Sequence, residues 1–218
     1  MVTKEEFWNI LGAYGSQIWP TQIIFFVMAI LLVGWLWLKP GRSQSLFAKL
    51  FLALAFAWNG ILFYMTLAKG MAGNSQGNYF LGSLFILVAA LFAVDLFRQK
   101  MQFTLPTAGW QRYMTLSLMV LVFCYPLFGI LSGHGLTSLI MPGTFPCPTT
   151  ALALLLLTMA LPQIDRIIYV LLLFFAIPFT PFYQIARYSV FEDTILFATG
   201  VYGLVLLVMY WKPKGVRT

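Results

Sequence analysis

The chain has 218 residues, of which 61% are hydrophobic and only 9% are charged. Soluble domains contain about 45–50% apolar and about 25% charged residues, so this composition excludes an ordinary soluble domain. A disordered chain is also excluded, because a sequence this rich in Phe, Leu and Trp would collapse in water. Two cysteines are too few for a disulfide framework or a zinc-ribbon array. These figures predict a single-domain integral membrane protein.

Apolar runs long enough to be helices follow one another along the chain, and a spanning helix needs about 20 such residues. In chain order the runs are 17–38, 45–68, 79–97, 111–132, 148–161, 166–186 and 193–211. Backbone amides in lipid must be paired within the segment, so each run is expected to be helical, and runs this long exclude a β-barrel. The sequence predicts an all-α bundle of seven transmembrane helices. The fifth run is short, so six spans are the alternative.

The positive charges predict the orientation of the bundle. Ten of the thirteen Lys and Arg residues fall on one side of a seven-span arrangement, and only Lys4, Lys69 and Arg187 fall on the other. Under the positive-inside rule the N-terminus lies outside and the basic tail (212–218) lies in the cytoplasm. Six spans would separate the tail from the basic early loops, so the charges favour seven. The same rule accounts for the net charge of +7 and indicates a lipid bilayer, not nucleic acid, as the partner.

Residues 1–16 precede the first span and predict a short amphipathic helix on the outer surface. Thr3 and Glu6 form a capping-box pattern that marks a helix start. Phe7, Leu11 and Tyr14 then recur at helical spacing, which places an apolar stripe on one face. We expect this helix to lead directly into the bundle of residues 17–211.

The loop between the fourth and fifth spans contains three prolines, Pro142, Pro146 and Pro148, within seven residues. Such spacing forbids a regular helix, and the run that follows is too short to cross about 30 Å of hydrocarbon. Either the bilayer is thinned there or the loop dips inward, and irregular backbone at that depth must be buried in protein or line a cavity. A dipping loop could form a pocket near Thr149 and Thr150. A tightly folded cap without a ligand is the alternative.

Polar residues inside the apolar runs are candidates for a ligand site. Most of them fall in the outer half of the bundle, as does the proline-rich loop. Pro126, Pro178 and Pro181 are expected to kink or break their helices there, whereas Asp95 is interpreted as structural, paired with Arg98 or Gln99. The predicted ligand-binding residues are Gln22, Trp58, Asn59, Tyr125, His134, Cys147, Thr149 and Thr150. Each of them alone is also consistent with helix packing.

A soft-metal site at Cys124, His134 and Cys147 is a second interpretation, since thiolate and imidazole suit copper(I) or zinc. A Cys124–Cys147 disulfide is a third. The sequence has no CxxC and only one histidine, and no Ser-His-Asp set or carboxylate pair is apparent, so neither a cofactor nor an enzymatic activity is predicted. The spans are interpreted as free of lysine, which excludes a retinal Schiff base.

Several motifs resemble an uncharacterised family of bacterial multi-pass proteins known by a domain-of-unknown-function label. They are Trp19-Pro20-Thr21-Gln22, Trp58-Asn59-Gly60, Tyr125-Pro126-Leu127 with Gly133-His134, and Phe145-Pro146-Cys147-Pro148-Thr149-Thr150. The resemblance covers nearly the whole chain and implies a location in the bacterial inner membrane. It implies no substrate, cofactor or catalytic residue.

Three functions are consistent with these features. The first is a small-solute transporter or channel-like protein with an outward-facing pocket, and the polar, kinked outer half favours it. The second is a metal-binding or redox membrane protein that uses Cys and His. The third is a scaffold or lipid-binding subunit without chemistry of its own. The sequence identifies no small-molecule ligand, and association into a homo-oligomer stays open.

Overall fold

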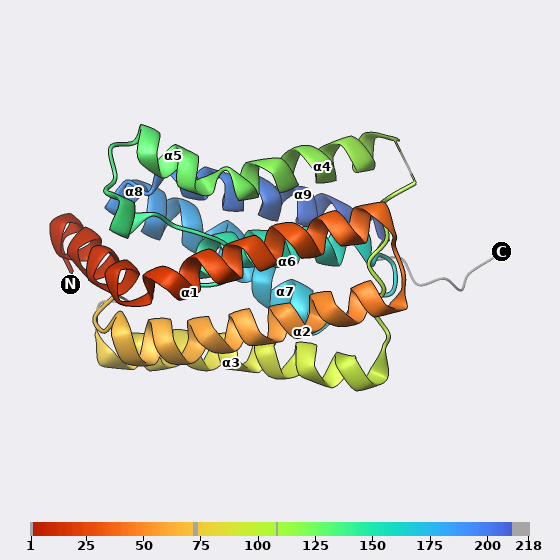
Figure 1. Ribbon diagram of the computed structural model, residues 1–218, viewed down its shortest axis with the longest axis horizontal. Coiled ribbons are helices and arrows are strands. Elements are labelled where there is room, and N and C mark those ends of the chain that lie inside the picture. Colours follow the sequence, from red (N-terminus) through yellow and green to blue (C-terminus); the bar gives the residue numbers. More distant parts are fainter. Residues whose placement is uncertain (1, 72–73, 108, 211–218) are drawn as a thin grey trace.

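The computed structural model describes residues 2–71, 74–107 and 109–210, and this part of the chain contains helices and no strand (Figure 1). The helices are α1 (Lys4–Leu38), α2 (Arg42–Trp58), η1 (Asn59–Leu67), α3 (Ser75–Arg98), α4 (Gly109–Phe123), α5 (Tyr125–Leu131), η2 (Leu136–Ser138), α6 (Pro146–Met159), α7 (Arg166–Phe174), η3 (Phe175–Ile185), α8 (Ala186–Tyr188), η4 (Phe191–Asp193) and α9 (Thr194–Tyr210). The predicted all-α fold is confirmed. The basic tail expected at 212–218 lies outside the described residues.

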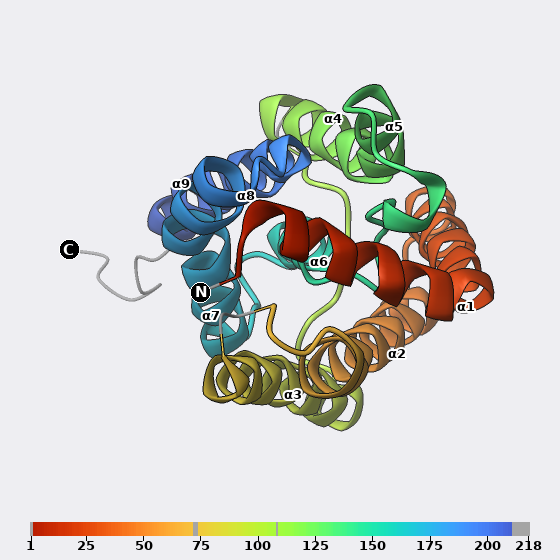
Figure 2. The ribbon, with the colours of Figure 1, turned by 90° about the vertical axis from the view of Figure 1, so that its left-hand side faces the viewer.

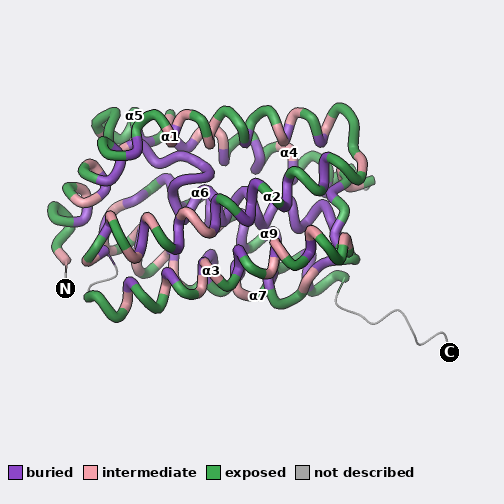
Figure 3. Tube along the Cα trace, turned by 60° about the horizontal axis from the view of Figure 1, so that its bottom comes forward, coloured by how far each residue is buried: buried purple, intermediate pink, exposed green. Residues whose placement is uncertain are grey.

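Helix α6 lies at the centre of the bundle, and α1, α2, α3, α4, α7 and α9 surround it (Figure 2). Every one of its residues is buried (Figure 3). Its sequence is apolar on all sides, as expected for a helix that has no face toward solvent or lipid. The surrounding helices instead carry exposed Leu, Ile, Val and Phe side chains on their outward faces.

Among the described residues, five helical stretches are long and apolar enough to cross a membrane: Lys4–Leu38, Arg42–Leu67, Ser75–Arg98, Arg166–Tyr188 and Phe191–Tyr210. A sixth results if α4 and α5, which meet at 53°, form one bent span. Helix α6 has 14 residues and is about 21 Å long, less than the roughly 30 Å of a bilayer core. The chain is therefore a membrane protein by its helices, while the seven-span count and the orientation stay predictions.

The helix breaks occur where prolines were expected to cause them. Helix α4 ends at Phe123, and α5 begins with Pro126 in its first turn. Pro178 and Pro181 lie inside η3, a π-helix of 11 residues, and neither can donate a main-chain hydrogen bond. A second π-helix, η1, begins at Asn59. π-Helical turns are rare and are often found at functional sites.

The segment before α6 is irregular and buried from Leu139 to Phe145. The prediction of a short fifth helix that follows a buried, irregular main chain is therefore confirmed. The prolines are placed differently from the expectation, because Pro142 lies in the irregular segment whereas Pro146 and Pro148 lie in the first turn of α6. At the other end of α6, the α3–α4 connection crosses the bundle. Its Met101 and Phe103 are fully buried, and the amide of Thr104 donates to the carbonyl of Met159 at 3.1 Å. Both ends of α6 are thus covered by loops.

Lys49 corrects two details of the sequence interpretation. It lies two turns inside α2 and is only 2% exposed, so the expectation that no lysine lies within a span is wrong. Its Nζ lies 3.0 Å from Oδ2 of Asp95 and also donates to the Asp95 carbonyl. Asp95 further accepts the amides of Lys100 and Met101. Asp95 is structural, as expected, but its cationic partner is Lys49 rather than Arg98.

The first four turns of α1 cross over the N-terminal end of α6 (Figure 2). We call residues 4–18 the N-terminal arm. The capping box of Thr3 and Glu6 is confirmed, and the arm continues into the rest of α1 as one helix with Pro20 inside it. The apolar stripe of the arm, Phe7, Leu11, Tyr14 and Ile18, is buried against the bundle.

Candidate functional site

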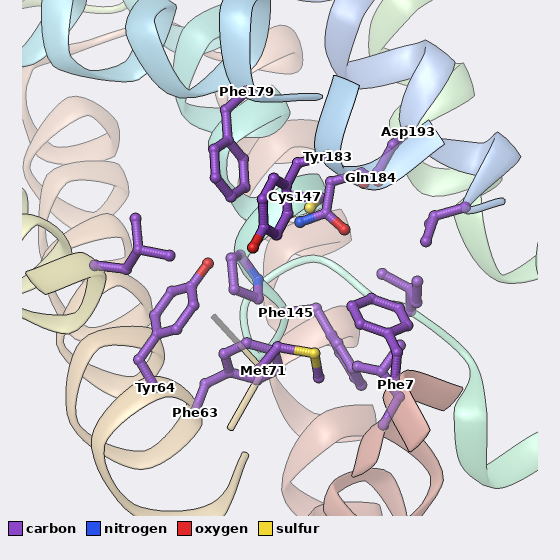
Figure 4. Close-up of a pocket in the computed structure, with 15 residues that line it drawn as sticks. Phe7, Phe63, Tyr64, Met71, Phe145, Cys147, Phe179, Tyr183, Gln184 and Asp193 are labelled. Carbon is purple, nitrogen blue, oxygen red and sulfur yellow. The ribbon is translucent and has the colours of Figure 1, made fainter. Parts of the chain in front are cut away.

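A small cavity lies beneath the N-terminal arm, at the N-terminal end of α6. It offers about 30 Å³ to the centres of water molecules, and one water needs on the order of 10–15 Å³ by this measure. Six aromatic side chains line it: Phe7, Phe63, Tyr64, Phe145, Phe179 and Tyr183. They come from α1, η1, η3 and the residue preceding α6, so both π-helices contribute to the walls (Figure 4).

Polar groups interrupt this aromatic lining. Tyr64 and Tyr183 point their hydroxyl groups toward each other across the cavity (Figure 4), and the Gln184 amide and the Cys147 thiol are further polar groups of the lining. Asp193 completes the lining. Gln184 is 9% exposed and Asp193 is not exposed at all. A cavity with a few converging polar groups on apolar walls is the usual form of a small-molecule site.

Asp193 is the most unusual group of the site. It is the last residue of η4, the short 3₁₀-helix that directly precedes α9, and its side chain is buried in the bundle. The Cys147 thiol and the Tyr125 hydroxyl are its polar neighbours, yet neither carboxylate oxygen has a hydrogen bond of acceptable geometry. A buried carboxylate that has only weakly placed neutral neighbours is costly, so its presence in an apolar bundle suggests a role other than packing.

Glu192 lies next to Asp193 and is also buried, but it has a partner. Its Oε1 is 2.9 Å from Nδ1 of His134. The indole of Trp8 packs on the His134 ring with 3.9 Å between ring centroids, and Trp8 Nε1 donates to the carbonyl of Tyr188. His134 therefore links the carboxylate of Glu192 to the N-terminal arm.

Three of the predicted ligand-binding residues hold the irregular segment before α6 in place. Gln22 donates to the carbonyl of Leu139 at 2.7 Å, and Asn59 donates to the carbonyl of Gly143 at 3.0 Å. The Thr149 hydroxyl accepts from the amide of Gly143 and donates to the carbonyl of Phe145. Gly143 has φ of +102°, a left-handed conformation that favours glycine. These side chains satisfy main-chain groups that a helix would have paired internally.

The other predicted residues have three different surroundings. Trp58 donates from Nε1 to the Tyr14 hydroxyl and so contacts the arm, not the cavity. Tyr125 and Cys147 lie against Asp193, as described above. Thr150 is fully buried, and its hydroxyl has no hydrogen-bond partner. Of the predicted set, the structure places only Cys147 in the wall of the cavity.

The predicted metal ligands are not gathered into a recognisable centre. Cys124 and Cys147 are both free thiols, the first half-buried and the second buried. Across residues 2–71, 74–107 and 109–210, no group of three or more His, Cys, Asp and Glu side chains is placed to hold a metal ion. The geometry does not favour a metal site or a Cys124–Cys147 disulfide.

The sequence interpretation missed Asp193, Tyr64 and Tyr183 as members of the site. Asp193 and Glu192 directly precede α9, and acidic residues are favourable at the N-terminal end of a helix dipole whether or not they belong to a site. One sequence signal could have drawn attention to them. The apolar run 194–210 that follows contains no Lys or Arg, so its own helix offers these two carboxylates no cationic partner. Tyr64 and Tyr183 carried no pattern of their own, since only the packing of η1 against η3 brings them together.

The comparison with known proteins gives a family and no function. No curated protein and no solved structure matches the chain. A family model described as "Family of unknown function (DUF6064)" matches residues 4–216. This match covers almost the entire chain, in agreement with the resemblance expected from its motifs. The chain therefore belongs to the family of unknown function DUF6064.

Proposed function

We propose that the protein is a small-solute transporter of the bacterial inner membrane, with its N-terminus outside and its C-terminus in the cytoplasm. The solute site is the cavity at the N-terminal end of α6. The single observation that carries this proposal is the fully buried Asp193 carboxylate in the cavity wall, whose polar neighbours, the Cys147 thiol and the Tyr125 hydroxyl, carry no positive charge. Ionisable residues inside membrane bundles are rare and mark substrate or ion paths.

The N-terminal arm is the moving part in this proposal. Phe7 and Leu11 of the arm form part of the cavity wall, so the arm covers the cavity on that side. The start of the arm is held by a few polar contacts. In one of them, Lys4 Nζ donates a hydrogen bond of 3.0 Å to Ser189 Oγ. Movement of the arm away from η2 and α8 would open the cavity toward the outer side.

A disulfide between the arm and η2 tests this mechanism. A Cβ placed on Gly12 would lie 3.1 Å from the Ser138 Oγ, close to the Cβ-to-sulfur separation of about 3 Å across a disulfide. The double variant Gly12→Cys/Ser138→Cys, in a Cys124→Ser background, should form this bond on oxidation. Gly12→Cys alone, treated with the same oxidant, is the matched control.

The measurement is swelling of proteoliposomes by light scattering, after mixing with hyperosmotic glycerol or methylammonium chloride. With the reduced double variant, we expect at least one probe to cause faster swelling than in protein-free liposomes. Oxidation should abolish this increase in swelling rate, and dithiothreitol should restore it. The control should respond to neither treatment. Swelling that equals that of protein-free liposomes for both probes in the reduced form contradicts transport, and swelling that survives the cross-link contradicts gating by the arm.

The orientation is tested separately by thiol labelling in sealed vesicles. Lys69 follows η1 and Lys100 follows α3, and both side chains are exposed. In a Cys124→Ser background, we expect a membrane-impermeant maleimide to label Lys69→Cys in right-side-out vesicles and Lys100→Cys only in inverted vesicles. The reverse pattern would place the N-terminus in the cytoplasm.

A further inference from the structure

We propose that the cavity binds a water-sized ammonium ion, such as ammonium or methylammonium, and that the ion replaces a proton on Asp193. This inference rests on the site assigned in the proposed function and names the class of its solute. It combines three independent observations: the charge of the groups around Asp193, the size of the cavity, and the polar atoms that reach it.

The groups around Asp193 favour a cation. Its titratable neighbours are Cys147 of α6, Tyr125 of α5, Tyr64 of η1 and Glu192 of η4. Each of them is neutral or negative in every protonation state. The ion pairs of Lys49 with Asp95 and of His134 with Glu192 do not include Asp193. The Arg187 guanidinium lies 5.5 Å from the centroid of the Tyr183 ring and donates to the carbonyl of Val2, so it packs on the cavity wall and is engaged with the main chain just before the arm. A buried carboxylate in such surroundings is neutralised either by a proton or by a bound cation.

The size of the cavity limits which cation fits. Its volume of about 30 Å³ for water centres corresponds to roughly two water-sized particles. Ammonium and methylammonium have one and two non-hydrogen atoms, so they match this room. Tetramethylammonium, with five, does not match it in the closed structure.

The cavity lining provides both hydrogen-bond acceptors and aromatic ring surfaces for an ammonium ion. The Gln184 amide and the hydroxyl groups of Tyr64 and Tyr183 reach the cavity and can accept N–H hydrogen bonds (Figure 4). Phe63 and Phe179 contribute ring surfaces against which a cation or a methyl group can pack. An alkali ion could be coordinated by the same oxygen atoms, but it has no N–H groups and so could not donate hydrogen bonds to them as an ammonium ion does.

Binding and proton release are coupled one to one in this proposal. The protonated carboxyl of Asp193 loses its proton to water, and the resulting carboxylate pairs with the incoming ammonium ion. The net charge of the cavity is unchanged, which avoids leaving an isolated charge in the bundle. In the pH range where the empty site is protonated, apparent affinity should rise tenfold for each unit of pH.

The test uses the purified full-length chain in detergent, in weakly buffered solution with a pH-sensitive dye. In the pH range where the apparent affinity rises tenfold per unit of pH, addition of methylammonium chloride should release one proton per chain at saturation. Sodium chloride and tetramethylammonium chloride at the same concentrations should release none. Equal release with sodium would overturn the ammonium class, and binding without proton release would overturn the exchange at Asp193.

Two variants locate the effect. Asp193→Asn should abolish proton release, whereas the matched control Asp165→Asn, at the N-cap of α7, should retain it. Gln184→Leu should weaken methylammonium binding about tenfold but still release one proton at saturation, because it removes one acceptor and leaves the carboxyl. This variant keeps the test valid if Asp193→Asn does not fold. Release by Asp193→Asn equal to that of the unaltered chain overturns the proposal.

The two proposals can fail separately. Arm-dependent swelling with glycerol but no proton release by methylammonium would retain the transporter and reject the ammonium site. Proton release without any swelling would retain the site and reject transport.

Discussion

The indole Nε1 of Trp58 donates a hydrogen bond of 2.8 Å to the hydroxyl of Tyr14. That hydroxyl in turn donates to the carbonyl of Thr144 at 2.7 Å. The relay joins α2, the N-terminal arm of α1 and the irregular segment before α6 through a single oxygen atom. It lies beside the Phe63 and Phe145 rings of the cavity wall, which pack edge-on against Tyr14.

The first prediction concerns this relay. Tyr14→Phe should lower the free energy of unfolding in detergent by about 1–3 kcal/mol, because it leaves a buried carbonyl and an indole N–H unpaired. The arm should also become easier to displace, with faster hydrogen exchange in residues 4–18. Tyr113→Phe, at a position 73% exposed, is the control and should change neither measurement. Unchanged exchange in the arm would show that the relay does not hold it.

The second prediction compares two adjacent threonines that are equally buried. Thr149→Val removes the acceptor for the Gly143 amide and the donor to the Phe145 carbonyl, and should cost about 1–3 kcal/mol. Thr150→Val removes a hydroxyl that has no partner, so it should be neutral or stabilising. Both changes conserve side-chain shape, and thermal unfolding of the two variants in the same detergent measures the difference. Equal losses would contradict the assigned hydrogen bonds.

Much of this fold follows from patterns that are local in the sequence. Helix positions, the proline-induced breaks and the short α6 all follow from apolar run lengths and from the backbone chemistry of proline. The irregular segment was predictable because Pro142 cannot continue a helix, whereas Pro146 and Pro148 suit the first turn of α6, where a main-chain N–H has no helical acceptor. The roles of Gln22, Asn59 and Thr149 were not, because their partners are main-chain groups more than 80 residues away for the first two.

The candidate site depends on contacts between distant segments, so the sequence located it only in part. The end of the bundle at which α6 begins and Cys147 were predicted, but Asp193 gained its meaning from burial beside Cys147 and Tyr125. A carboxylate at a helix start looks the same in sequence whether it faces water or a bundle core. Lys49 illustrates the same difficulty. It lies near the start of the apolar run 45–68, and nothing in that position indicates its buried ion pair with Asp95.

The third prediction concerns that ion pair. Lys49→Met should lower the free energy of unfolding by about 3–5 kcal/mol, because it leaves the buried Asp95 carboxylate without its cation. Lys39→Met, at an exposed position after α1, is the matched control and should have little effect. Denaturant titration in detergent compares the two. A small loss at Lys49 would show that the amides of Lys100 and Met101 suffice for Asp95.

The fourth prediction concerns the close approach of the arm to η2. A Cβ on Gly15 would lie 1.8 Å from the carbonyl oxygen of Thr137, which is main chain and cannot rotate away. Gly15→Ala should therefore displace the arm and cost about 1–3 kcal/mol or more of overpacking. Gly34→Ala, in the same helix with open space around the new methyl group, should be neutral or gain up to about 1 kcal/mol.

Thermal unfolding and hydrogen exchange of residues 4–18 distinguish the two glycine variants. Since Phe7 and Leu11 close the cavity, displacement of the arm in Gly15→Ala should also speed its exchange and open the cavity to solvent. If both alanine variants behave alike, the arm does not pack against Thr137 as described. If only Gly15→Ala unfolds earlier while its arm stays protected, the contact stabilises the bundle without controlling access to the cavity.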